Sequence, residues 1–210
     1  RKELLAVTQK YGVPILEDDC YADNRYDGDL PTSILNLDDT NSVMYVGSFS
    51  KTIAPGMSLG YMTAPQLILD RAMGVKSGRV SEFTAMAVEK YARKYLDAHI
   101  EEINKIQRTK RDAMLSALGE NFGTGAKWSD PDGGLYIWVK LKEGSDMGAL
   151  NKRSVEEIDV GFHPGVNYSP DGTSGKNHIR LCYGYNQPDE ITEGISRLAN
   201  FLSKEGVLDS

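Results

Sequence analysis

A single lysine set among small hydroxyl residues is the strongest chemical feature of this sequence. Lys51 follows an apolar run, Val43 to Val46 (VMYV), and lies in the stretch SFSKTIAPGMSLGY. An amine at the end of a buried strand is partly desolvated, which favours its uncharged form and lets it form a Schiff base with an aldehyde. The hydroxyls of Ser48 and Ser50 suit a phosphate beside it. Taken alone, the tetrapeptide SFSK more often marks a solvated loop, so its meaning depends on the rest of the chain.

A second group of polar residues follows another apolar run. Val13 to Leu16 (VPIL) is typical of a strand covered on both faces, and the sequence EDDCY comes directly after it. Ligands of open α/β sheets bind at the carboxyl ends of the strands. Two predicted parallel strands therefore deliver Asp18, Tyr21 and Lys51 to one edge of a sheet. A turn or helix-capping cluster is the alternative for the acids, and Glu17 and Asp19 are interpreted as structural.

The elements that must position these residues follow from periodicity and turn signals. The chain opens with a helix over residues 1–11, and a third short strand covers 59–63. After Gly119 the pattern changes to an antiparallel arrangement of strands with two further helices. These later elements are predicted at 135–141 (strand), 147–157 (helix), 160–163 (strand), 177–183 (strand) and from Pro188 (helix).

A long helical pattern occupies residues 81–118, as two helices or one kinked helix, because the register of apolar residues shifts near His99. One face carries an aromatic stripe, which is interpreted as core: Phe83, Ala87, Tyr91 and Tyr95. We expect 1–97 to be the later part of a large domain, 98–118 a linking helix and 119–210 a small α+β domain.

Composition excludes several classes of protein. The 210 residues are 40% hydrophobic and 26% charged, with a formal charge of −6, which argues against a nucleic-acid surface. No apolar stretch approaches the roughly 18 residues of a membrane span, and no signal peptide is expected. Cys20 and Cys182 lack metal-ligand spacing, so two buried thiols and a cytoplasmic location are predicted. The histidines His99, His163 and His178 show no catalytic spacing and are assigned no role.

Five ordered motifs resemble one known family. EDDCY, SFSKTIAPGMSLGY, PDGGLYIWV, HPGVNYSP and HIRLCYGYN are similar in order and spacing to the class I/II aminotransferases, in particular the 2-aminoadipate and aromatic subgroup. These are pyridoxal-phosphate (PLP) enzymes of fold type I. The resemblance implies an α/β fold: part of a large PLP-binding domain with a mostly parallel sheet, followed by a smaller C-terminal α+β domain. The resemblance begins in the middle of the family's large domain, so the family's N-terminal part is expected upstream of this sequence.

The resemblance also implies roles for individual residues. Lys51 would carry the cofactor as a Schiff base and then move the proton, and Asp18 would hold the pyridinium nitrogen protonated. Tyr21 would donate to the cofactor phenolate, Ser48 would bind its phosphate, and Arg180 would pair with the substrate α-carboxylate. The implied reaction moves an amino group between an amino acid and a 2-oxo acid, in a homodimer.

One position departs from the family pattern. Seven residues after the lysine, the family usually has an arginine on the cofactor phosphate, in the context Pro-Gly-x-Arg-x-Gly. This sequence has Ser58 there. A neutral residue in place of a fixed cation puts cofactor affinity in doubt more than the chemistry.

Two other functions stay open. An aminotransferase-like sensor domain of a winged-helix transcription regulator would share all five motifs. Another PLP reaction on the same scaffold, such as that of a lyase, decarboxylase or oxidase, would also use Lys51. The sequence upstream of Arg1 would separate the regulator from the enzymes.

Overall fold

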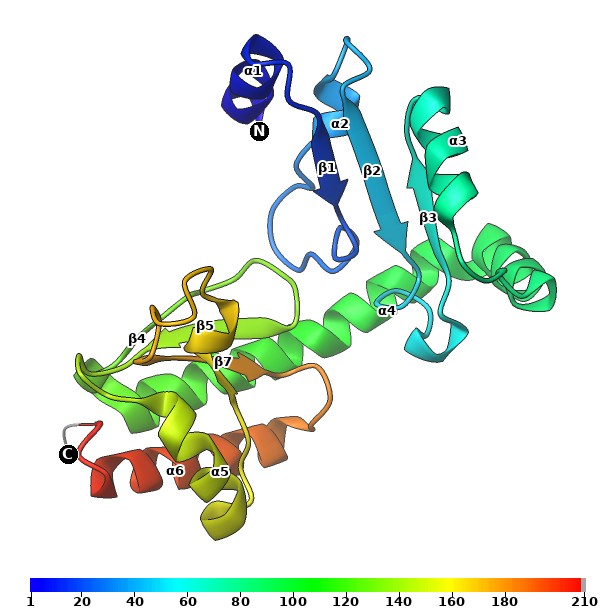
Figure 1. Ribbon diagram of the computed structural model, residues 1–210. Helices are drawn as coiled ribbons and strands as arrows, with labels where there is room; N and C mark the ends of the chain where they lie inside the picture. The colour runs from blue at the N-terminus through cyan, green and yellow to red at the C-terminus, as the bar shows by residue number, and fades with distance from the viewer. Residues whose placement is uncertain (209–210) are drawn as a thin grey trace. The chain divides into compact units, whose positions relative to one another are not determined.

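The computed structural model describes residues 1–208, which divide into two compact units with the boundary between Asn104 and Lys105. The boundary between the units falls within one continuous helix, α4 (Glu82–Phe122), so of the two predicted alternatives the pair of separate helices is wrong (Figure 1). The predicted linking helix, 98–118, lies inside α4, and the predicted domain limits stay a prediction.

The first unit is built on a three-stranded sheet with the order β1-β2-β3. Strands β1 (Ile15–Asp18) and β2 (Val43–Ser48) are parallel, as predicted, with Asp18 opposite Val46. Strand β3 (Gly60–Thr63) adds an antiparallel edge that the sequence analysis did not predict. All four residues of β3 are exposed, so the core of this unit lies elsewhere.

That core forms where the first helices meet the beginning of the sheet. Leu5 of α1 (Lys2–Lys10), Ile34 of α2 (Ile34–Leu37) and Val43 of β2 are buried together. The buried Glu17 carboxylate completes the packing, because it accepts hydrogen bonds from the backbone N–H groups at the start of α2, at 2.9 and 3.0 Å. Glu17 is therefore structural, as predicted. The unit continues through η1 (Pro55–Met57) and α3 (Gln66–Val75).

The aromatic stripe of α4 is not core, so that prediction is wrong. Phe83 is 83% exposed, and Tyr91 and Tyr95 are 38% and 46% exposed. The more covered stripe of the helix is shifted from the aromatic one and includes Val88, which is 3% exposed. The spacing of apolar residues along the helix is compatible with two different stripes, and the less aromatic one is the more buried.

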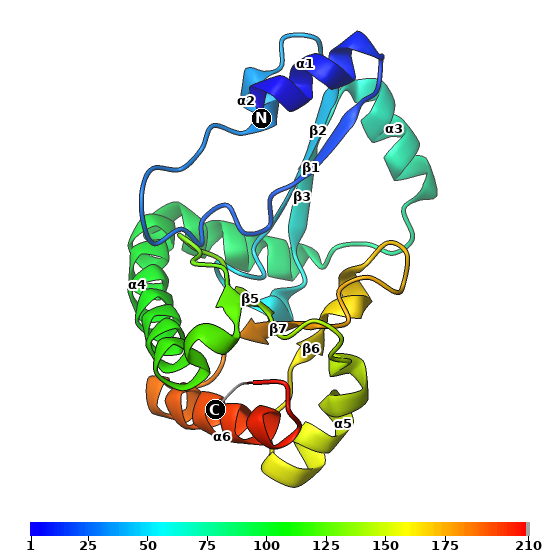
Figure 2. The ribbon, with the colours of Figure 1, turned by 90° about the vertical axis from the view of Figure 1, so that its left-hand side faces the viewer.

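The second unit has a four-stranded antiparallel sheet with the order β4-β5-β7-β6. Helices α5, α6 and the later part of α4 gather on one side of this sheet (Figure 2). The bounds of its elements are η2 (Gly123–Gly125), β4 (Lys127–Trp128), β5 (Tyr136–Lys140), α5 (Met147–Ile158), β6 (His163–Pro164), η3 (Gly165–Tyr168), β7 (His178–Cys182) and α6 (Pro188–Lys204).

Alternation along β5 and β7 gives this sheet two different faces. Ile137, Val139, Ile179 and Leu181 are buried against the helices. The residues between them point to the opposite face, which carries rings and cations instead. The predicted start of α6 is confirmed, because Pro188 occupies its first turn and Gln187 and Glu190 form a capping box.

The two cysteines differ from the prediction of buried thiols. Cys20 is half-buried and Cys182 is exposed, both as free thiols. Cys182 is the last residue of β7 and belongs to the ring-bearing face of the sheet, where burial is incomplete. None of the helices in residues 1–208 combines the length and apolar composition needed to cross a bilayer.

Candidate active site

The first unit brings the predicted lysine and tyrosine together. The Lys51 Nζ lies 5.8 Å from the centre of the Tyr21 ring. Lys51 follows the end of β2, and Tyr21 follows the end of β1 in the turn after the acidic cluster. Because β1 and β2 are parallel, their carboxyl ends meet at one edge of the sheet, which is why residues 30 positions apart in the sequence become neighbours.

Asp18 and Ser48 end the two parallel strands beside this pair. Asp18 lies opposite Val46 in the ladder, and Ser48 is two residues further along β2, so both side chains share one face. The Ser48 Oγ accepts a hydrogen bond from the Ser50 N–H at 3.1 Å. This bond uses the Ser50 N–H and holds the Ser48 hydroxyl just before Lys51, where its own O–H can donate to an oxyanion ligand.

The Cys20 thiol lies close enough to Asp18 and Lys51 for both charges to act on its pKa. Burial raises the pKa of the Cys20 thiol, as does its hydrogen bond to the Asp18 carboxylate, while the nearby Lys51 ammonium acts in the opposite direction. The Cys20 backbone N–H also contacts Asp18 Oδ1, at 3.4 Å. The thiol thus lies near a carboxylate and an amine that the sequence analysis had placed at the same edge.

The neighbouring acid, Asp19, has a different partner. The Tyr45 hydroxyl donates to Asp19 Oδ2 at 3.2 Å. Burial, the Asp19 carboxylate and Tyr61 together raise the pKa of Tyr45 well above its ordinary value. Asp19 therefore ties the turn to β2, in agreement with its predicted structural role.

Ser58 lies at the end of η1 in the left-handed backbone region, with φ 46° and ψ 42°. The chain turns there between the Pro55-Gly56 pair and β3. Ser58, the residue that differs from the family pattern, therefore lies in a tight turn after Lys51.

Arg180 belongs to the second unit, in the middle of β7. Its Cζ lies 4.0 Å from the centre of the Tyr136 ring and 4.3 Å from that of Tyr168. Its Nε is buried and has no hydrogen-bond partner among the described residues. A buried guanidinium N–H without an acceptor suits an anionic ligand that the protein itself does not supply.

The sequence analysis missed the rings around this arginine. Trp138 lies directly opposite Arg180 in the sheet and stacks on His178, with ring centres 5.4 Å apart. Trp138 also contacts Tyr168 edge-on, at 5.9 Å. Period-two alternation in YIWVK and HIRLC was the available signal, since it places these rings on the face that carries Arg180.

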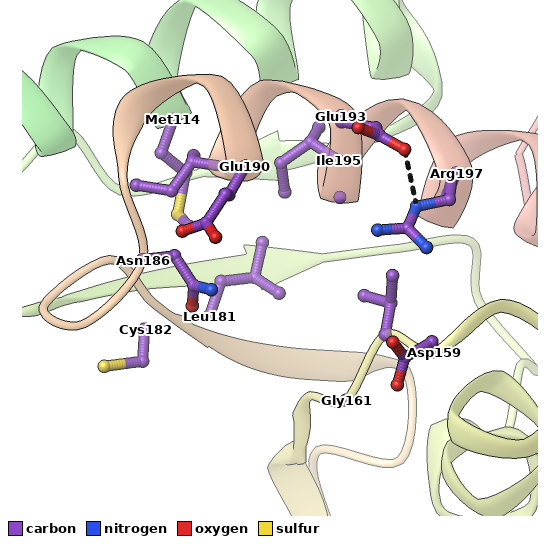
Figure 3. Close-up of a pocket in the computed structure, with 13 residues that line it drawn as sticks. Met114, Asp159, Gly161, Leu181, Cys182, Asn186, Glu190, Glu193, Ile195 and Arg197 are labelled. Atoms are coloured by element: carbon purple, nitrogen blue, oxygen red, sulfur yellow. Dashed lines mark ion pairs between the residues drawn. The ribbon is translucent and has the colours of Figure 1, made fainter.

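A separate cavity of about 450 Å³ lies in the second unit, between α6, β7 and the segment after α5 (Figure 3). Its polar lining includes Asp159, Glu190, Asn186 and an ion pair between Arg197 and Glu193 at 3.6 Å. None of the predicted site residues lines it. Among the described residues, no group of three or more histidine, cysteine or acidic side chains could hold a metal ion.

Comparison with known proteins identifies the family. The sequence model described as "Aminotransferase class I and II" matches residues 1–198, so the chain belongs to this family. The fold is accordingly that of part of a fold type I PLP-binding domain followed by a smaller α+β domain.

Individual relatives agree with this assignment. The chain is 35% identical to "Aromatic-amino-acid aminotransferase 1" of Thermococcus litoralis, over 98% of its own length and 50% of the relative's. It is 28% identical to the α-aminoadipate aminotransferase LysN of Thermus thermophilus, with a TM-score of 0.91, covering 97% of this chain and 53% of that one. It is also 29% identical to the "Uncharacterized HTH-type transcriptional regulator YdfD" of Bacillus subtilis, over 97% of this chain and 42% of the relative. The chain thus spans about half the length of the curated relatives it matches.

Proposed function

We propose that this chain is part of a PLP-dependent aminotransferase that moves an amino group between an amino acid and a 2-oxo acid. The observation that carries the proposal is that Lys51 and Tyr21 lie close together at the edge of the sheet. At this edge β1 ends in Asp18 and β2 ends in Ser48. Membership of the aminotransferase family supports it. The crystal structure of LysN, which holds a phosphopyridoxyl–leucine adduct, supports the cofactor and the substrate class.

The donor set fits pyridoxal phosphate group by group. Lys51 supplies an amine for the aldehyde, and the Ser48 hydroxyl supplies a donor for the phosphate. Tyr21 supplies a phenol for the ring oxygen, and Asp18 a carboxylate for the ring nitrogen. When bound, the cofactor supplies an electron sink that stabilises negative charge at the substrate Cα.

The chain's own residues then do the binding and the proton transfer. Asp18 would hold the ring nitrogen in its protonated form, because a carboxylate stabilises a cation beside it. The Lys51 Nζ would serve as the base that removes the proton from the substrate Cα. Arg180, through two parallel N–H groups, binds the α-carboxylate of the amino acid. Ser58 lies in the turn where a phosphate ligand would be expected.

A homodimer in the cytoplasm is part of the same proposal. The family resemblance supports a dimer whose active sites draw residues from both chains. The absence of metal-type cysteine spacing and the free thiols Cys20 and Cys182 are consistent with a reducing compartment.

A regulator's sensor domain is the second candidate, favoured by the similarity to YdfD. A turnover experiment distinguishes the aminotransferase from the sensor domain. The full-length protein, loaded with cofactor, is first converted to its aminated form with an amino acid, and a 2-oxo acid is then added. An aminotransferase restores the original absorption spectrum and releases a new amino acid, whereas a sensor or another PLP enzyme does not complete this cycle.

A further inference from the structure

The ring-bearing face of the second unit holds an aromatic cluster around one cation. The cluster consists of Tyr136, Trp138, Tyr168, His178 and Arg180, and we call it the Arg180 cluster. Four of its members come from two paired strands, β5 and β7, which fix their positions through the ladder. Tyr168 is different, because it comes from η3, a short turn outside the sheet.

Ring contacts are the prominent constraint on the Arg180 side chain. Its guanidinium carbon lies 4.0 and 4.3 Å from the centres of the Tyr136 and Tyr168 rings, within the range of a cation–π interaction. Its Nε is buried without a hydrogen-bond partner in the described chain. Planar stacking restricts the tilt of a guanidinium where hydrogen bonds do not, so the two rings define the direction in which its N–H groups point.

The loop that carries Tyr168 is held against β7 by a glycine. Gly165 begins η3 and is buried, and a Cβ at this position would come within 2.6 Å of the His178 Cβ and 3.0 Å of the His178 backbone oxygen. A side chain there would therefore force η3 away from the strand. This close approach is what brings the Tyr168 ring over Arg180.

Trp138 supports the same ring from the sheet. Its edge-on contact with Tyr168 has a centre-to-centre distance of 5.9 Å, and its opposite neighbour in the ladder is Arg180 itself. Edge-to-face pairs at such distances are favourable beyond simple burial. Tyr168 is thus constrained on one side by Trp138 and by the Gly165 contact at its base.

We propose that Tyr168 is a positioning residue that orients the Arg180 guanidinium for carboxylate binding, with Tyr136 as its partner and Trp138 as its support. This inference rests on the proposed function, in which Arg180 binds the substrate α-carboxylate. It assigns the role to the ring face of Tyr168 and not to its hydroxyl. The α-carboxylate is common to all amino acid substrates, so the effect of losing the ring is independent of the substrate side chain.

The test uses the full-length protein with cofactor and compares Tyr168→Leu with Tyr168→Phe. Leucine keeps an apolar side chain but removes the ring, whereas phenylalanine keeps the ring and removes only the hydroxyl. We expect Tyr168→Leu to raise KM about twofold to fivefold, since a cation–π contact to a partly exposed ring is worth less than a decade in an equilibrium constant. The increase should be equal for an aromatic and an aliphatic amino acid, with kcat nearly unchanged, and Tyr168→Phe should match the wild type.

A second readout does not depend on turnover. The Arg180 Nε–H signal, assigned in ¹⁵N-arginine-labelled protein by its loss in Arg180→Lys, should show a lower heteronuclear NOE in Tyr168→Leu and an unchanged one in Tyr168→Phe. A protein that fails to transaminate would overturn the proposed function, while this measurement would still decide the role of Tyr168. An unchanged NOE in Tyr168→Leu, or a KM increase confined to one class of amino acid, would overturn the positioning role.

Discussion

The amine of Lys51 lies 5.8 Å from the centre of the Tyr21 ring, although the two residues follow different strands. The Asn24 side chain helps to hold this arrangement, because its Nδ2 donates to the Lys51 backbone oxygen at 3.4 Å. The Lys51 backbone is therefore tied to the turn that carries Tyr21. A fixed distance between an amine and a phenol is what a carbonyl cofactor lying between strand ends requires.

We expect Lys51 to be the residue that bonds covalently to the cofactor. Borohydride reduction of the loaded protein, followed by peptide mapping, should leave the pyridoxyl mass on the peptide that contains Lys51. The matched control is Lys51→Ala, which should bind the cofactor without incorporating the label. Label on another lysine of the wild-type protein would show that the assignment is wrong.

Asp18→Asn should keep the cofactor bound and slow proton removal from the substrate. The amide retains an oxygen for the Cys20 N–H contact, so the turn stays intact, but a neutral group cannot hold the ring nitrogen protonated. Loss of one electrostatic stabiliser typically costs about a hundredfold or more in rate, measured here as a single-turnover rate. Asp19→Asn is the control, since Asp19 accepts from Tyr45 at 3.2 Å and should leave that rate near the wild-type value. Equal rates in Asp18→Asn and wild type would rule out the electron-sink role.

Ser58→Arg should tighten cofactor binding. Serine offers the phosphate one neutral hydrogen bond, whereas arginine offers two charged ones to a dianion, a difference on the order of 1–3 kcal/mol. At about 1.4 kcal/mol per decade, this is roughly tenfold to a hundredfold in affinity. Cofactor release in the presence of an aldehyde trap measures it, with Ser58→Ala as the control for loss of the hydroxyl. Unchanged or faster release from Ser58→Arg would mean that another cation serves the phosphate or that the phosphate lies elsewhere.

Gly47→Ala should destabilise the first unit. A Cβ at Gly47 would lie 2.5 Å from the Tyr61 hydroxyl oxygen and 2.7 Å from the Tyr61 Cε1, so the ring must move. Overpacking of this kind costs about 1–3 kcal/mol in the free energy of unfolding, which denaturant titration measures. The same substitution in a Tyr61→Ala background removes the obstacle, so the cost should shrink there. An equal cost in both backgrounds would place the strain in the backbone of β2 instead.

His178 should make the protein less stable in mild acid. Burial lowers the pKa of His178 below its ordinary value of 6.5, and the Lys140 ammonium opposite it lowers the pKa further, while Glu143 acts in the opposite direction. Below pH 6.5 the unfolded chain binds a proton more readily than the folded one. Stability therefore rises with pH in this window and is lost as pH falls below it.

Urea unfolding between pH 5 and 8 would measure this dependence. The wild type should lose more stability than His178→Gln as the pH falls from about 6.5, the ordinary histidine value. His99→Gln serves as the matched control, because His99 lies on α4 in contact with Tyr91 and outside the Arg180 cluster. Parallel pH profiles for the wild type and His178→Gln would contradict the prediction.

The site in the first unit was largely predictable because local patterns determine it. Apolar runs of four residues identified β1 and β2, and the rule that ligands bind at carboxyl strand ends then placed Asp18, Tyr21 and Lys51 together. The Arg180 cluster was not predictable in the same way. Which residue of β5 lies opposite Arg180 depends on the register of two strands separated by more than 35 residues, and no local signal specifies it.

The burial of the aromatic stripe of α4 could not be predicted from local sequence either. Periodicity identified a helix correctly, but it could not choose between two stripes, because burial depends on what packs against the helix. The antiparallel direction of β3 could not be predicted for a similar reason, since a short apolar run carries no information on strand direction.

The alternation along β5 and β7 has an evolutionary consequence. Residues that hold the second unit together occupy one face of these strands, and residues around Arg180 occupy the other, so a mutation at Tyr136 or Trp138 leaves the buried contacts of Ile137 and Val139 in place. Selection can thus change the ring-bearing face without a large penalty in folding. A scaffold with this separation is well suited to divergence, because the residues around Arg180 can change while the buried contacts on the other face stay in place.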